Sequence, residues 1–171
     1  MKIRKLALLG LLTAVALTIY LVEAQIPPVV PVPGVKLGLS NIVTVFAVFF
    51  LGWKEGAGVL AARIFLGSVF AGNFSAILYS AAGGVLAIGV TIALRRVLRK
   101  DQIFVAGALG AAAHALGQMA VAVAVSGTPG LLIFLPVTIL SGLVTGCFTG
   151  ACAQILVKRG GKLWKTFSEW I

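Results

Sequence analysis

The chain has 171 residues, of which 60% are hydrophobic and 11% charged, and its mean hydropathy is +1.12. Fourteen basic residues against four acidic ones give a net charge of +10. A chain this apolar cannot keep its apolar surface out of water, so the composition excludes a soluble enzyme, a coiled coil and a disordered tail. It indicates a single all-α integral membrane domain over residues 1–171.

Apolar runs predict a bundle of six transmembrane helices, because about 20 mostly apolar residues cross a bilayer. In chain order they cover residues 6–23, 37–53, 56–72, 74–94, 103–125 and 136–157. The stretch from 56 to 94 is twice one span, and we divide it near Gly72-Asn73, where small and polar residues gather. Pro136 is tolerated in the first turn of the last helix.

The two ends of the chain allow further interpretations, a signal peptide at the N-terminus and an interfacial helix at the C-terminus. The basic start, apolar core and Val22-Glu23-Ala24 also resemble a cleavable signal peptide, although cleavage would remove one of the six helices. Residues 162–171 alternate Trp and apolar side chains with basic ones at helical spacing. This pattern predicts a short interfacial helix that anchors the chain at the inner leaflet or docks a partner.

The basic residues predict the orientation of the bundle. Eleven of the fourteen lie in three clusters, within residues 2–5, 95–100 and 158–165. Six helices place all three clusters on one side, whereas five would separate them, so the positive-inside rule favours six helices with both termini cytoplasmic. We therefore expect a multi-pass protein of the cell (inner) membrane of a prokaryote, in contact with lipid. The clusters mark loops, and we expect no binding to nucleic acid.

Small residues predict close helix contacts, because helices in lipid associate through packing. Gly142, Gly146 and Gly150 form a stripe that we assign to packing inside the bundle. Gly10, Ala14 and Thr18 form a second stripe, for which a docking face for another membrane protein competes with internal packing.

Polar side chains within spans are costly and commonly functional. Seven lie in or beside the predicted helices: Glu23, Lys36, Asn41, Arg63, Asn73, His114 and Gln118. Most fall in the outer half, beneath an apolar, proline-rich segment over residues 26–34 that is too rich in proline for a helix. A strap over convergent polar groups describes a small-molecule site, and two cations with one His against one Glu favour an anionic or polar ligand.

Each polar residue also has a structural interpretation. Lys36 can reach the headgroups or pair with Glu23. Arg63 can clamp a helix end, His114 can be a hydrogen-bonded packing residue, and the asparagines can cap or cross-link helices. Their shared location favours the site.

The sequence lacks the residues that ATP hydrolysis and metal-dependent diphosphate chemistry require. The chain has no phosphate-binding G-x-x-x-x-G-K-[ST] motif, so it cannot hydrolyse ATP itself. Asp101 is its one aspartate, and no carboxylates cluster as Mg²⁺-dependent diphosphate chemistry requires. We expect no catalytic residues, no metal site and no cofactor.

Several strings resemble one family. They are Pro33-Gly34-Val35-Lys36-Leu37-Gly38-Leu39-Ser40-Asn41-Ile42-Val43, Arg63 with Gly67, Tyr79-Ser80-Ala81-Ala82-Gly83-Gly84 and His114-Ala115-Leu116-Gly117-Gln118. Over about residues 1–157 the chain is similar to the heptaprenyl diphosphate synthase component I membrane family, also called Gx transporter proteins. Ala115 departs from the pattern, which has Asn after the His, so a His–Asn polar pair has no support here.

That family resembles the substrate-binding S components of energy-coupling-factor (ECF) transporters. The resemblance implies a six-helix subunit for uptake of a vitamin-like compound or an isoprenoid or quinone precursor, bound near the outer face under the loop over residues 24–36. It also implies a coupling subunit and ATPases as partners, docked through small residues of the first helix. The family name implies the alternative of an accessory membrane component of a prenyl diphosphate synthase, without a catalytic site of its own. A purely structural scaffold is the third hypothesis.

Overall fold

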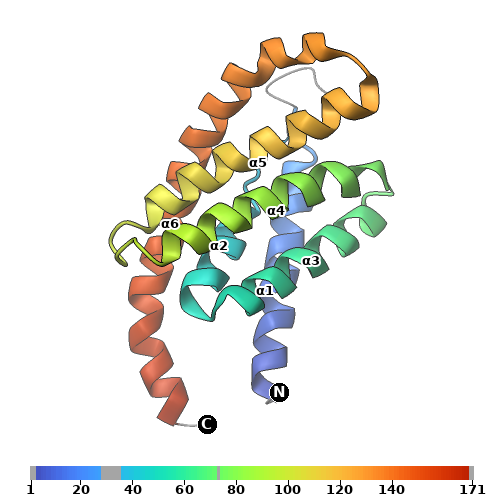
Figure 1. Ribbon diagram of the computed structural model, residues 1–171. Helices are drawn as coiled ribbons and strands as arrows, with labels where there is room; N and C mark the ends of the chain where they lie inside the picture. Colours follow the sequence, from blue (N-terminus) through green and yellow to red (C-terminus); the bar gives the residue numbers. More distant parts are fainter. Residues whose placement is uncertain (1–2, 28–35, 73, 170–171) are drawn as a thin grey trace.

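The computed structural model describes residues 3–27, 36–72 and 74–169, with only the backbone for residue 4 and residues 162–169, and it is all-helical (Figure 1). The elements are α1 (Ile3–Glu23), α2 (Asn41–Phe50), α3 (Trp53–Phe70), α4 (Ser75–Arg95), α5 (Ile103–Ser126), the 3₁₀-helix η1 (Pro129–Phe134) and α6 (Leu135–Glu169). The two termini lie at the same end of the molecule (Figure 1). Both ends of a chain lie on one side of a membrane when the number of crossings is even, and the charge clusters predict such a number.

Six α-helices are present in the described residues, and four stretches are long and apolar enough to cross a membrane. These are α1, α4, α5 and the continuous stretch of η1 and α6. The other two helices, α2 and α3, are not among these candidate spans. α2 has 10 residues and is therefore about 15 Å long, half the thickness of the hydrocarbon core. α3 carries Lys54, Glu55 and Arg63 within its 18 residues.

The helix expected over residues 37–53 is too long at both ends. Gly38 has φ +79°, a left-handed conformation that glycine adopts without strain, and α2 begins only at Asn41. Gly52, at φ +142°, separates α2 from α3 at the other end. Residues 36–40 therefore run without helical structure, and Gly38 and Ser40 are buried in the bundle.

The break expected near Gly72 is confirmed, because α3 ends at Phe70 and α4 begins at Ser75. The separate tail helix over residues 162–171 is wrong. α6 begins with Pro136 in its first turn, as expected, but continues without interruption to Glu169, through Gly160-Gly161. Its 35 residues make a helix about 52 Å long, so α6 exceeds the hydrocarbon core of about 30 Å.

The glycine stripe on α6 packs inside the bundle, as predicted. A Cβ built on Gly146 would lie 2.5 Å from the carbonyl oxygen of Gly107 on α5, and one on Gly150 would lie 2.8 Å from the Cα of Phe104. The backbones of α5 and α6 thus touch where side chains would separate them. The stripe on α1 differs. A Cβ on Gly10 would meet nothing within 4 Å, and Ala14 and Thr18 are exposed, so this stripe faces outward.

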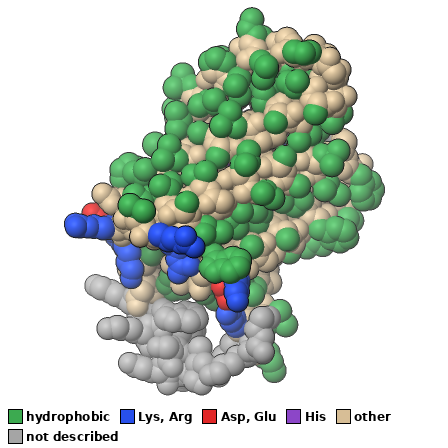
Figure 2. Space-filling view, in the orientation of Figure 1, with side chains coloured by type: hydrophobic (Ala, Val, Ile, Leu, Met, Phe, Trp, Pro, Cys, Tyr) green, Lys and Arg blue, Asp and Glu red, His purple; other side chains and the backbone are tan. Residues whose placement is uncertain are grey.

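Charged side chains gather at the end of the molecule where the termini lie, and hydrophobic side chains dominate the rest of the same face (Figure 2). At this end Lys5 of α1 forms an ion pair with Glu55 of α3. The asymmetry is the one that the positive-inside rule requires of a membrane bundle.

Candidate functional site

The non-helical segment over residues 36–40 is held by side chains from three helices. The amide of Gly38 donates to Oε1 of Glu23 at 2.6 Å, and the amide of Lys36 donates to Oε1 of Gln118 at 3.1 Å. The hydroxyl of Thr145, on α6, reaches the carbonyl of Leu37 at 3.5 Å. Because backbone groups inside a membrane bundle find no bulk water, such partners are what allow the chain to run without helical structure there.

Glu23 and Gln118 therefore bind the backbone of the broken segment. Both are buried, with 4% and 2% of their surface exposed. The ion pair between Glu23 and Lys36, one of the structural interpretations of these residues, is not formed: the described ion pairs within 4 Å include Lys5 with Glu55 but not these two. The Glu23 carboxylate thus fixes the path of the chain into α2.

Tyr20 organises the two cations of the site. The Nζ atom of Lys36 lies 4.1 Å from the centroid of the Tyr20 ring, and the Cζ atom of Arg63 lies 5.6 Å from it. Both are within the range of a cation–π interaction. Gly67 permits this packing, since a Cβ there would lie 2.9 Å from Cε1 of the tyrosine. Sequence reasoning missed Tyr20, although its position one turn before Glu23 on α1 could have pointed to it.

His114 lies between two glycines. A Cβ on Gly83 of α4 would be 2.8 Å from Nδ1 and Cε1 of the imidazole, and a Cβ on Gly38 would be 3.4 Å from its Cδ2. His114 is 3% exposed. Gly83 thus makes room for the histidine of α5. At Gly89 of the same helix, an added Cβ would meet nothing within 4 Å.

Several buried polar atoms have no hydrogen-bond partner among the described residues. They are both side-chain heteroatoms of Asn41, Oγ1 of Thr44, Nε and Nη2 of Arg63, and Nδ1 of His114. All four residues are at least nine-tenths buried. A buried polar group without a partner costs about 1–3 kcal/mol, so the concentration of such atoms on α2, α3 and α5 marks a place that a water molecule or a ligand completes.

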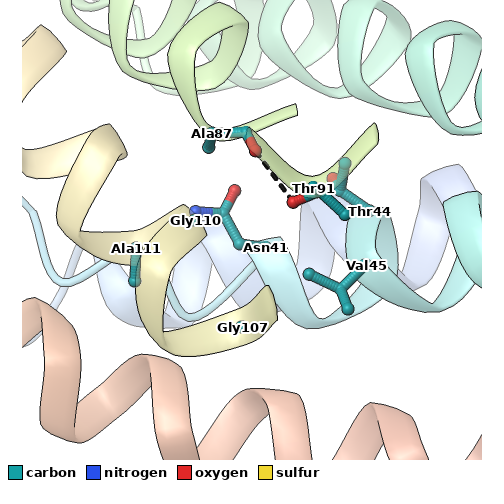
Figure 3. Close-up of a pocket in the computed structure, with 8 residues that line it drawn as sticks. All are labelled: Asn41, Thr44, Val45, Ala87, Thr91, Gly107, Gly110 and Ala111. Atoms are coloured by element: carbon teal, nitrogen blue, oxygen red, sulfur yellow. Dashed lines mark hydrogen bonds between the residues drawn. The ribbon is translucent and has the colours of Figure 1, made fainter. Parts of the chain in front are cut away.

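A small pocket adjoins the side chains of Asn41 and Thr44. Its volume is about 10 Å³, and it is lined by Asn41, Thr44, Val45, Ala87, Thr91, Gly107, Gly110 and Ala111 (Figure 3). Asn41 projects between α4 and α5, opposite the hydroxyl of Thr91, which donates to the carbonyl of Ala87 at 2.8 Å (Figure 3). A space of this size accepts about one water molecule or one polar group of a ligand.

The structure brings six of the seven predicted site residues together. Gly38 connects Glu23 with Asn41 and His114, and Lys36 connects Gln118 with Tyr20 and Arg63. Asn73 lies outside the described residues, as does most of the strap expected over residues 26–34. The polar residues of α1, α2 and α5 thus converge on the non-helical segment before α2, and Arg63 of α3 joins them through Tyr20.

The family model described as heptaprenyl diphosphate synthase component I matches residues 12–156. No curated protein and no solved structure matches the chain. The matched range covers α2 to α5, most of α1 and most of α6, and with them every residue of the site.

Proposed function

We propose that this chain, a membrane protein that belongs to the heptaprenyl diphosphate synthase component I family, is the substrate-binding subunit of an uptake system. It captures a small molecule of the vitamin or isoprenoid- and quinone-precursor type near the outer face, under the loop over residues 24–36. Both termini lie in the cytoplasm of a prokaryotic cell. The protein binds its ligand without chemical conversion and has no catalytic residues.

The observation that carries this proposal is the non-helical segment over residues 36–40, which leads into α2 and is surrounded by buried polar side chains. Non-helical backbone at membrane depth is tolerated where it is buried in protein or lines a cavity, and polar groups there can face a ligand. Asn41, which begins α2 directly after this segment, has unpartnered side-chain atoms, and Arg63 has two more on α3. A protein that served only as a scaffold would gain stability from apolar residues at these positions.

A subunit without its own ATPase motif needs partners, and we propose an ECF-type coupling subunit with ATPases. The outward stripe of Gly10, Ala14 and Thr18 is the docking surface, because small residues let a partner helix approach closely. Gly10→Leu should release the coupling subunit in pull-down experiments without lowering the unfolding temperature, since an added Cβ there meets nothing within 4 Å and leucine favours the helix over glycine. A complex that survives this substitution rejects this docking surface.

Uptake measurements test the site itself. We first identify the co-purified compound by native mass spectrometry of gently solubilised protein and then follow its uptake into cells. Lys36→Ala and Asn41→Ala should reduce uptake at least about tenfold, as expected for loss of buried polar contacts. Lys54→Ala, at an exposed cation on α3, is the matched control. Uptake that remains unchanged in both site variants would remove the proposed site.

The family description supports a second candidate, an accessory membrane component of heptaprenyl diphosphate synthase without a catalytic site of its own. This function predicts a stable complex with a soluble prenyl synthase. Affinity purification from native membranes separates the two candidates: recovery of a prenyl synthase without ATPases favours the accessory component, and recovery of ATPases with a membrane coupling subunit favours uptake.

A further inference from the structure

We infer that the ligand carries an oxyanion, a carboxylate or a phosphate, and that this group binds to one edge of the Arg63 guanidinium with Lys36 as the second cation. The inference rests on the proposed substrate site and specifies the chemistry of its ligand. It also assigns separate roles to Arg63 and Glu23, which the sequence pattern treated alike.

The first step concerns the charge of Arg63. Its side chain is 2% exposed, and a guanidinium remains protonated in proteins. A buried charge is costly unless an opposite charge and hydrogen bonds compensate it. The contact with the Tyr20 ring, 5.6 Å from Cζ to the centroid, supplies only the modest attraction of a cation–π pair. Arg63 therefore lacks a full counterpart among the described residues.

The second step concerns which nitrogens are unpartnered. They are Nε and Nη2. The N–H bonds of these two atoms point in the same direction along one edge of the planar guanidinium, and this edge can grip two oxygens of one carboxylate or phosphate. A water molecule offers a single oxygen and no charge, so it satisfies this edge incompletely.

The third step concerns the available carboxylates. Oε1 of Glu23 accepts the amide of Gly38 at 2.6 Å, and no described ion pair within 4 Å joins Glu23 to Arg63 or Lys36. Glu55 pairs with Lys5 at the start of α3, and Asp101 is exposed in the loop before α5. The two cations on Tyr20 thus face one buried carboxylate, Glu23, which attracts both of them but forms no described ion pair with either. An oxyanion beside the ring would neutralise the remaining excess charge.

The experiment measures the unfolding temperature of the purified protein in a neutral detergent. Sodium acetate, phosphate and pyrophosphate are each compared with sodium chloride at equal ionic strength. At least one oxyanion should stabilise the wild-type protein measurably, because a ligand that binds the folded state raises its stability. Arg63→Gln should abolish the shift, and Arg63→Lys should weaken apparent binding about tenfold, since an ammonium cannot form the two-pronged contact. Arg96→Gln, at an exposed arginine after α4, should respond as wild type.

The inference is overturned if none of the three anions stabilises the wild-type protein, or if Arg63→Gln responds as wild type does. Should Arg63→Gln fail to fold, a full response of Arg63→Lys is the overturning result. Mass spectrometry of co-purified compounds identifies whether the bound oxyanion belongs to a lipid headgroup or to a soluble compound. A neutral or cationic substrate that is taken up removes this inference and leaves the uptake function standing. Oxyanion binding without any uptake removes the uptake function and leaves this inference standing.

Discussion

Replacement of Gly83 by alanine tests whether the close contact between α4 and His114 shapes the site. The added Cβ would lie 2.8 Å from Cε1 and Nδ1 of the imidazole and 2.9 Å from the backbone oxygen of His114. The backbone oxygen cannot move without shifting α5, so the helices must separate locally. Gly89→Ala on the same helix is the matched control, because a Cβ there meets nothing within 4 Å.

The magnitudes follow from two opposing effects. Overpacking a tight contact costs about 1–3 kcal/mol, whereas alanine stabilises a helix interior by about 0.5–1 kcal/mol relative to glycine. The helix effect is common to both variants, so their difference in unfolding free energy isolates the contact at about 1–3 kcal/mol. For a chain of this length that difference corresponds to about 2–12 °C in unfolding temperature.

The assay is thermal unfolding in one neutral detergent at one scan rate, followed by tryptophan fluorescence. We expect Gly83→Ala to unfold below the wild-type protein and Gly89→Ala at or above it. Uptake should fall in Gly83→Ala and persist in Gly89→Ala, because the imidazole is displaced in the former alone. Equal unfolding temperatures for the two variants would refute the reasoning.

Three further outcomes are expected. Glu23→Ala removes the acceptor of a buried amide and should lower the unfolding free energy by about 1–3 kcal/mol, whereas Glu23→Gln keeps a carbonyl oxygen and should lose less; equal losses in thermal unfolding would contradict this role. Thr44→Val removes a buried hydroxyl without a described partner, so stability should hold while uptake falls, and a large loss of stability would contradict the functional reading. On a background without native cysteines, a membrane-impermeant maleimide should label Thr128→Cys in intact cells and Arg99→Cys only after permeabilisation; the reverse pattern would invert the orientation.

The sequence by itself predicted the membrane class, the break between the third and fourth helices and the start of the last helix. Hydropathy is a local property of each run, so the break at Gly72 and the start of the last helix at Pro136 could be predicted from residue type. The three basic clusters, from which the orientation is predicted, are also visible in the sequence, because each consists of neighbouring residues. The glycine repeat of Gly142 and Gly146 indicated a packing face through its spacing.

The tertiary structure decided where the second helix begins and what the polar residues do. Residues 37–40 are apolar enough to begin the second helix, yet they lie outside it, since Gly38 adopts a positive φ and distant side chains bind the backbone of this segment. Those partners lie 15 and 82 residues away in the chain, at Glu23 and Gln118. Non-helical backbone inside a membrane bundle is stable only when such groups converge from other helices, and no local pattern in a sequence reports that convergence.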